Sequence, residues 1–556
     1  MVAVSFVLVL ALVSSTVVAQ PGTNGFTETL ACFRQWLTLA PPKLFTESVH
    51  EWIPLEEETP TPTSDQDPAD IGLSYILQQL NIQPDEFTRR TNFTDSFGVT
   101  HLYGMPLHQG LLIEDLHAAA HIKNESTVKI SSRKAVKAAV DCLGVPFYNA
   151  IAPVMESYET DNGKILVWVF QLRDNPTTQW IEVKVDINTG DIVSKEDVKR
   201  DFTYTVIKLP NENAHDGVSK ILSPENLQAS PNGWTDGFEL KGNNVLVNYK
   251  KDKTFGTSTR GIFSGVFDPT LPPQTPKNLV AGAINAFYVA NMVHDVFYAY
   301  GFNEPAGNFQ RDNFNRGGIA GDPVIINVQG SKKKNHADFN TPFDGRSGVL
   351  NLHIYTATNP NRDPALDNTI LTHELGHGVS DRLTGGAQTK MCMMETESRG
   401  LSEGYSDMIA IIFTAKPEDT RNTKKVIAEY VRGISRGMRR YPYTTDMKVN
   451  PLKYQNAIGE KNPYNLGEIW ATMLLEVYWN LVDAYGFSAN LHDATQEEGN
   501  IIFLQLFVGT LMIQPCNPTF ISAYHAMLVA DDVYYGGIHK HLIREGFAKR
   551  GLGSIS

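Results

Sequence analysis

Two histidines and one glutamate in the second half of the chain have the spacing of a metal site. His373, Glu374 and His377 form the pattern H-E-x-x-H. On a helix, residues four apart lie on the same face, so both imidazoles can bind one Zn²⁺ while Glu374 projects beside them towards a water molecule. The five-residue pattern alone is weak evidence, because ordinary amphipathic helices also place two histidines beside a surface glutamate in this way.

Two acidic residues further along the chain also favour a metal site. Glu403 lies 26 residues after His377 and leads into the apolar run from Met408 to Phe413, which predicts a mostly buried helix with Glu403 near its start. Asp407 follows four residues later and shares the face of Glu403. Because buried carboxylates are costly without a partner, we expect Glu403 to be the third zinc ligand. We expect Asp407 to accept the other ring N–H of a ligand histidine.

The residues around the motif exclude one family of zinc proteases and resemble another. The excluded layout has Gly and His three and six residues after the second histidine, where this chain has Ser380 and Leu383. The segments His373-Glu374-x-x-His377-Gly378-x-Ser380-x-Arg382-Leu383-Thr384-Gly385-Gly386 and Glu403-Gly404-x-Ser406-Asp407 resemble the fungalysin family instead. Its members are secreted fungal zinc metallopeptidases distantly similar to thermolysin, and the likeness covers nearly the whole chain.

The resemblance implies an α+β chain made as a preproenzyme. Small α+β modules form the propeptide, and a two-lobed thermolysin-like catalytic domain follows. Its N-terminal lobe is β-rich, its C-terminal lobe is mainly α-helical, and the zinc helix lies in the cleft between them.

The length and composition agree with a soluble protein of several domains. The 556 residues are too many for one ordinary domain. Hydrophobic residues make up 42% and charged residues 20%, and the formal charge of -13 gives no reason to expect nucleic-acid binding. Residues 1–19 are apolar and predict a cleaved secretory signal. A membrane anchor is the alternative, but this run is short and polar residues 14–16 interrupt it. We expect a secreted, extracellular protein.

Residues 20–200 are expected to form the propeptide. Residues 54–71 are an acidic, Pro/Thr-rich linker, and residues about 85–135 and about 134–200 resemble two propeptide modules. Lys199-Arg200 is a dibasic cleavage site, and the bulky residue in Asp201-Phe202 leaves self-cleavage equally open. The N-terminal lobe would then span residues 201–360 and the helical lobe residues 361–556. The resemblance implies that the propeptide acts as an intramolecular inhibitor.

Glycosylation sequons and cysteines add to the picture of a secreted protein. The sequons at Asn92 and Asn124 both precede residue 200, so we expect no N-glycan on the mature domain. A disulfide between Cys392 and Cys516 is allowed in a secreted protein, and two buried thiols are about equally expected.

The family likeness also identifies a substrate-binding segment, from Lys334 to Pro342, before a predicted strand at residues 349–355. Family members hold extended substrate with main-chain groups and an asparagine side chain of an edge strand, which points to Asn335 and Ala337. His336 stands where the family has a second asparagine.

The expected activity is hydrolysis of proteins by a monomeric secreted endopeptidase with one Zn²⁺ per chain. Glu374 is expected to act as general base for the attacking water. A second donor, His or Tyr, shares the oxyanion charge in thermolysin-like enzymes, and Tyr405, Tyr464 and His525 are candidates. His294, in a predicted buried helix at residues 279–300, is either a ligand or relay, or a satisfied core histidine, which we favour.

A catalytically inactive binding protein with the same fold is the rival hypothesis. His336 and the pair Tyr524-His525 depart from the family pattern and favour it. The intact ligand set and Glu374 oppose it, because an inactive copy has no use for a general base.

Overall fold

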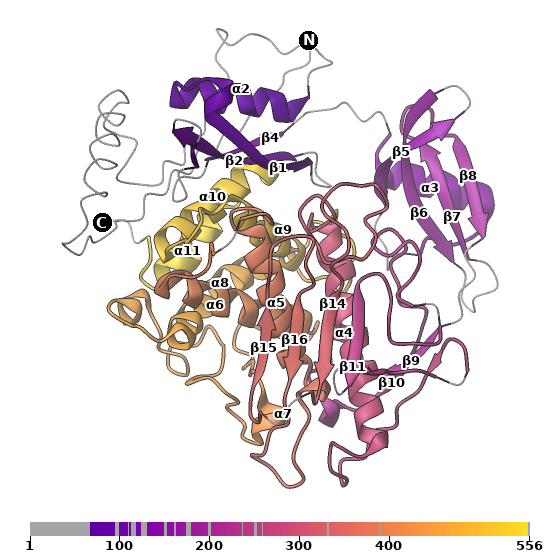
Figure 1. Ribbon diagram of the computed structural model, residues 1–556, viewed down its shortest axis with the longest axis vertical. Helices are drawn as coiled ribbons and strands as arrows, with labels where there is room; N and C mark the ends of the chain where they lie inside the picture. The colour runs from indigo at the N-terminus through magenta and orange to yellow at the C-terminus, as the bar shows by residue number, and fades with distance from the viewer. Residues whose placement is uncertain are drawn as a thin grey trace.

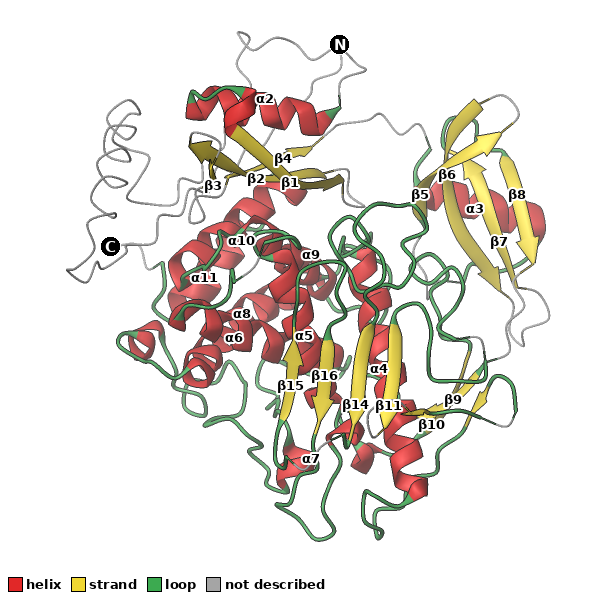
Figure 2. Ribbon diagram, viewed as in Figure 1, coloured by secondary structure: helices red, strands yellow, loops and turns green. Residues whose placement is uncertain are grey.

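Sheets and helices occupy successive stretches of the chain, so the protein is α+β, as the sequence predicts (Figures 1 and 2). The computed structural model describes residues 67–94, 99–108, 111–112, 118–123, 130–148, 153–160, 163–173, 180–197, 202–235, 237–249, 253–257, 259–330, 333–389 and 391–553. The predicted signal, the linker up to residue 66 and the dibasic site at residues 199–200 lie outside these residues.

The first unit, residues 67–123, packs one helix on one antiparallel sheet. Helix α2 (Pro68–Leu80) begins at Asp67, whose side chain accepts the N–H of Ala69. Because helix α2 starts at Pro68, the predicted linker ends at least four residues earlier than expected. Strand β2 lies centrally, and the sheet consists of β1 (Phe87–Thr94), β2 (Val99–His108), β3 (Leu111–Leu112) and β4 (Ala118–Lys123).

The second unit, residues 130–197, has the same kind of architecture. Helix α3 (Ser132–Leu143) buries Ala135 and Ala139 against Phe170 and Val183 of the sheet. The four strands pair with their sequence neighbours and are β5 (Val154–Thr160), β6 (Gly163–Arg173), β7 (Trp180–Asp186) and β8 (Ile192–Asp197).

The sheet region, residues 203–352, contains two further sheets. The smaller consists of β10 (Ser219–Leu222), β9 (Thr203–Val206) and β13 (Ile262–Phe263). The larger is a mixed sheet in the order β12 (Lys253–Thr254), β11 (Val245–Tyr249), β14 (Val324–Val328), β16 (Val349–Leu352) and β15 (Ala337–Asn340). Strand β15 is therefore an edge strand.

Helix α4 (Pro276–Ala299) packs along the sheet region (Figure 2). Its length and apolar composition would suit a membrane span, but 83% of its apolar window is buried inside the protein. Helix α4 is therefore a core helix of this region, which agrees with the buried helix predicted at residues 279–300.

The helical region, residues 368–553, follows. Its helices are α5 (Asn368–Leu383), α6 (Thr396–Phe413), α7 (Glu429–Arg432), α8 (Pro463–Tyr485), α9 (Gly499–Ile513), α10 (Phe520–Tyr535) and α11 (Lys540–Lys549). Of the two alternatives for the cysteines, the structure has the disulfide: Cys392 and Cys516 are bonded and join the segment after α5 to the segment after α9.

The two units contact different parts of the chain. Tyr103 of the first unit donates a hydrogen bond to the carbonyl of Met512 in the helical region, at 2.6 Å. In the second unit, the carbonyl of Val169 accepts a hydrogen bond from Gln228 of the sheet region, at 2.9 Å.

Candidate metal centre

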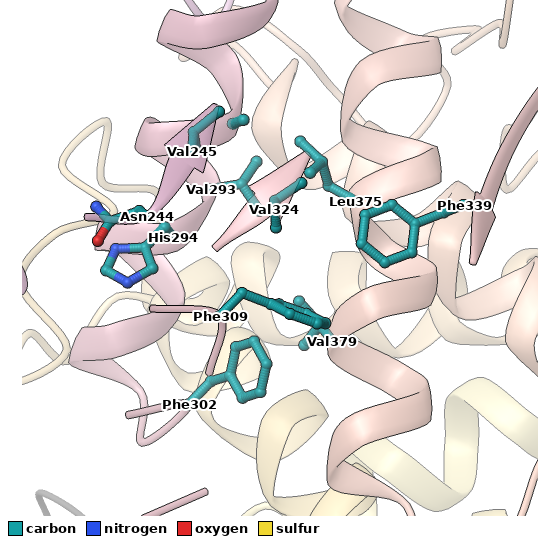
Figure 3. A pocket seen from close by; sticks show the side chains of 11 residues that line it. Asn244, Val245, Val293, His294, Phe302, Phe309, Val324, Phe339, Leu375 and Val379 are labelled. Carbon is teal, nitrogen blue, oxygen red and sulfur yellow. The ribbon is translucent and has the colours of Figure 1, made fainter. Parts of the chain in front are cut away.

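Helix α5 carries the H-E-x-x-H motif and is fixed at its start and along one face. Asp367 is its N-cap and accepts the N–H of Thr369. Leu375 and Val379 point into an apolar cavity that residues of α4, β11 and β14 also line (Figure 3). His373 and His377 are each two positions from Leu375, which is slightly more than half a helical turn. They therefore lie on the opposite face of the helix.

A close contact between helices brings Glu403 to the histidines. A Cβ at Gly376 of α5 would lie only 3.0 Å from the Cα of Ser406 on α6, so glycine allows the two helices to approach. The sequence predicted that Glu403 lies near the start of its helix. Helix α6 begins at Thr396, so Glu403 is in its third turn instead. A Cβ at Gly400 of α6 would clash with the Cβ of Leu466 on α8, so glycine also allows these two helices to approach.

Three side chains meet in the geometry of a metal site. Ligand atoms of His373, His377 and Glu403 all lie within 4.8 Å of one another. Nε2 of His373 is 3.4 Å from Oε2 of Glu403, and Nε2 of His377 is 3.8 Å from Oε1. Oε2 of Glu403 is buried and makes no hydrogen bond. Two nitrogen donors and a carboxylate that converge in this way fit a divalent cation such as Zn²⁺.

The outer nitrogen of His373 faces a fixed carboxylate. Nδ1 of His373 lies 2.7 Å from Oδ1 of Asp407. Arg439 holds both oxygens of Asp407 at 2.6 and 2.7 Å, and the hydroxyl of Tyr443 donates to Oδ2. Burial raises the pKa of Asp407, but Arg439 and His373 outweigh burial and hold that pKa well below its usual range.

The charges around the ligands favour a cation between them. Burial lowers the pKa of His373, but Asp407 and Glu403 outweigh it and raise that pKa to about 10. For Glu403, burial acts to raise the pKa. The two histidines and Arg439 outweigh burial and lower that pKa to about 2. The carboxylates therefore remain charged and attract positive charge, either a proton on His373 or a metal ion.

His377 has a neutral partner instead. Its Nδ1 lies 2.9 Å from the hydroxyl of Ser402, which donates in turn to Asp381 at 3.3 Å. Burial lowers the pKa of His377, so this imidazole is kept neutral, as a metal ligand must be.

Glu374 lies beside the three ligands without belonging to their cluster. Burial raises its pKa to about 7, while the charge of His373 lowers it and that of Glu403 raises it. Asp338 and His336 of the neighbouring edge segment also act on this carboxyl group. A carboxyl group in this position can exchange a proton near neutral pH.

The edge strand next to α5 has free main-chain groups. The N–H of His353 donates to the carbonyl of His336, so the main-chain groups of His336 face β16. Along the antiparallel pair β15–β16, residues whose main-chain groups face the partner strand alternate with residues whose groups face away. The N–H and C=O of Ala337 therefore point away from β16, towards the open side. The side chain of Asn335 bonds to Thr356.

His336 and His353 both lie close to Asp338 at this edge. Its Nε2 is 3.2 Å from Oδ1 of Asp338, and Nε2 of the buried His353 lies 3.7 Å from the same oxygen.

The three candidates for a second oxyanion donor differ in position. Tyr405 is buried and donates to Gln514 at 2.7 Å, away from the ligands. His525 is exposed on α10 and packs on Tyr524. Tyr464 is 50% exposed, and the charges of Glu403 and Glu374 both act on its hydroxyl group. Of the three candidates, Tyr464 is therefore the one whose hydroxyl group is close enough to Glu403 and Glu374 to interact with their charges.

His294 belongs to a structural network. Its Nδ1 lies 2.9 Å from Asp295, which also accepts hydrogen bonds from Asn226, Ser230 and Trp234. This arrangement agrees with the satisfied core histidine that we favoured.

Four residues around the ligands escaped the sequence analysis. Asp381 lies four residues after His377, so helical spacing could have indicated it, and Ser402 directly precedes Glu403. Arg439 and Tyr443 come from an irregular segment after α7, which has no fixed spacing from α6 and gives no sequence signal.

Comparison with known proteins agrees with this geometry. Residues 203–556 match the model of a family described as fungalysin metallopeptidase (M36). The chain is similar to extracellular metalloproteinase 1 of Trichophyton equinum, with 34% identity over 454 residues, 78% of this chain and 72% of the relative. The protein of the same name from Arthroderma otae is 35% identical over 413 residues, 71% of this chain and 65% of the relative.

Proposed function

The chain belongs to the fungalysin family of metallopeptidases, and on that premise we propose that His373, His377 and Glu403 hold one Zn²⁺ per chain and that Glu374 is the general base. The protein is a secreted, extracellular metalloendopeptidase, and its substrates are proteins. The convergence of three ligand atoms within 4.8 Å is the observation that carries the proposal.

Zinc suits this site better than a harder cation. Two imidazoles and one carboxylate are typical of catalytic zinc, whereas Ca²⁺ and Mg²⁺ prefer oxygen ligands only. When bound, Zn²⁺ polarises the substrate carbonyl and makes water acidic enough to react near neutral pH.

Glu374 is proposed to move the proton. It lies between the two ligand histidines on α5, is buried, and is not one of the three clustered ligands. A carboxylate withdrawn from water is a stronger base than an exposed one. It takes the proton of the attacking water and returns it to the amine that leaves.

The other residues orient this machinery. Asp407 fixes the ring of His373 and makes it a more basic ligand, and Arg439 keeps Asp407 charged. Tyr464 is proposed to donate its hydroxyl hydrogen to the oxygen that becomes negative during the reaction.

Substrate is proposed to lie as an added strand along the open side of β15. The main-chain groups of Ala337 would bind its backbone, and Asn335 remains a predicted contact. The bond between Asn335 and Thr356 favours main-chain binding by Ala337 over side-chain binding by Asn335 in this conformation.

The domain organisation is also proposed. Residues 1–19 are the signal peptide and residues 20–200 the propeptide, with the first and second units as its modules. Residues 201–360 form the N-terminal lobe and residues 361–556 the helical lobe of a two-lobed monomer, with α5 in the cleft. The propeptide inhibits the enzyme until it is cut near residue 200.

Casein hydrolysis by the secreted mature protein tests this function. We expect the activity to disappear with o-phenanthroline and to return with added zinc, and metal analysis to give one zinc per chain. One bound zinc without any cleavage would favour the inactive binding protein. N-terminal sequencing of the secreted protein tests the cut: a start near Gln20 would contradict processing near residue 200.

A further inference from the structure

A buried pair of histidines lies on the face of the first unit that meets the helical region. His101 on β2 and His121 on β4 are direct cross-strand partners. Their Nδ1 atoms are 2.7 Å apart, and both side chains have no exposed surface. The neighbouring residue Leu102 points to the other face of the sheet, into the core shared with α2.

The pair is part of the contact between the first unit and the helical region. The ring of Phe93 stacks on His101 at 4.9 Å, and the ring of Tyr103 meets His121 at 5.7 Å. Phe93 and Tyr103 belong to the same hydrophobic core as the helical region, and the Tyr103 hydroxyl bonds to Met512. In Figure 1 the first unit lies over α9 and α10.

The short distance between the two rings limits how many protons the pair can hold. A neutral imidazole has one N–H and one bare nitrogen, whereas an imidazolium has two N–H groups. A contact of 2.7 Å between the Nδ1 atoms needs one donor and one acceptor. The pair can therefore be neutral or carry one charge. With a charge on both rings, two N–H groups would face each other and two like charges would be buried together.

Among the described residues, the groups that line the contact beside the pair are mostly neutral. From the first unit these include the phenol of Tyr103 and the guanidinium of Arg90, which line a hollow at the contact. From the helical region, the hollow is lined by Gly385, Thr389, Ile513, Gln514, Pro515 and Cys516. Helix α9 has no ionisable side chain. On α10, Asp531 is paired with His539 and Asp532 with Lys540.

We propose that this face docks the first unit onto the helical region as a proton-sensitive contact, and that uptake of a second proton by the His101–His121 pair opens it. The biological meaning rests on the proposed function, because it takes the first unit to be a propeptide module. Acid outside the cell would then loosen the propeptide from the enzyme. Opening that is linked to one additional proton becomes about tenfold more favourable for each pH unit of acidification.

Hydrogen–deuterium exchange on the full-length Glu374→Gln protein tests the proposal without an activity measurement. Amide exchange in β4 and in the C-terminal half of α9, corrected for the intrinsic rate, is followed from about pH 7.5 to about pH 5. We expect protection in both segments to fall together, by about tenfold per pH unit at the acid end. The variant His101→Asn/His121→Asn should keep its protection, whereas His541→Asn, at an exposed histidine of α11, should behave as the parent does.

Equal exchange in the parent and the double variant, with or without a pH dependence, would overturn the proposal. If the double variant is already unprotected at neutral pH, C2–H exchange of the two imidazoles in the parent decides instead. Protonation of both rings must then coincide with the loss of amide protection, and two protonated rings within a protected contact would overturn the proposal. Failure of the proposed function would appear separately, as a wild-type protein that binds one zinc but does not hydrolyse casein.

Discussion

Nδ1 of His373 lies 2.7 Å from Oδ1 of Asp407, across the contact between helices α5 and α6. Asp407 cannot turn away, because Arg439 binds both of its oxygens. The ring of His373 is therefore held with Nε2 directed at Glu403. The affinity of the site for metal should thus depend on a residue that does not touch the metal.

The variant Asp407→Asn should bind zinc about 10- to 100-fold more weakly. The amide lacks the charge that makes His373 basic and leaves Arg439 buried without its partner. Competition with a chromophoric chelator measures the affinity, and circular dichroism at the same temperature verifies that the protein is folded. Ser402→Ala, at the neutral partner of His377, is the matched control. Its affinity for zinc should fall less than that of Asp407→Asn. An unchanged affinity for Asp407→Asn would contradict the role of this carboxylate.

Glu374→Gln should keep one zinc per chain and lose about 10²- to 10⁴-fold in kcat. The amide fills the same space but cannot take a proton from water. Metal analysis and casein hydrolysis on the same sample separate the two effects. Glu545→Gln, at an exposed glutamate of α11, should leave both unchanged. Cleavage of casein by Glu374→Gln at the wild-type rate would remove Glu374 as the base.

Tyr464→Phe should lower kcat by about 10²-fold or more with little change in KM. The hydroxyl is proposed to act only when the oxyanion forms, so ground-state binding should not need it. Tyr405→Phe removes a hydroxyl that bonds to Gln514 inside the helical region and should affect stability rather than kcat. If both variants behave alike in steady-state kinetics, Tyr464 is not the second donor.

Ala337→Pro should raise KM about tenfold, the effect of one lost hydrogen bond of roughly 1.4 kcal/mol. The N–H that proline removes points to the open side of β15, so the pairing with β16 should survive. Asp338→Pro is the contrasting variant, because its N–H faces β16 and its loss should lower the melting temperature. An unchanged KM for a folded Ala337→Pro enzyme would mean that substrate does not use this edge.

Asp367 should make stability depend on pH. Burial raises its pKa to about 7, well above the ordinary value near about 3.9. The contribution of Asp367 to the free energy of unfolding is therefore fully present below about pH 4. It is lost as the pH rises through about 7, because the charged form is disfavoured in the folded protein. Asp367→Ser keeps an N-cap for α5 but carries no charge. Its melting temperature relative to wild type should rise between about pH 4.5 and pH 8, and a constant difference would contradict the buried charge.

The regular period of the helix explains which parts of the site were predictable. His373, His377, Glu403 and Asp407 lie on two helices, where residues four apart share a face. The structure brings these four side chains together, and the predicted family and α+β class are confirmed. The start of α6 was misplaced because the polar residues before Glu403 resemble a loop, although the structure has them in the helix.

Long-range contacts were not predictable in the same way. Arg439 reaches Asp407 from an irregular segment, and no spacing rule links the two. The bond between Tyr103 and Met512 joins residues 409 positions apart. Such contacts depend on how whole elements pack, and a single sequence carries no local pattern for them.

The two units before residue 200 bind different regions, through Tyr103 on one side and Val169 on the other. A cut near residue 200 would leave them joined to each other, so that they would form a bivalent ligand. When one unit detaches, the other unit stays bound and holds it at a high effective concentration near its binding site. The detached unit therefore rebinds before both units can diffuse away. Escape of the severed segment therefore needs both contacts open at once, and a second cut between the units would hasten it more than further trimming at its end.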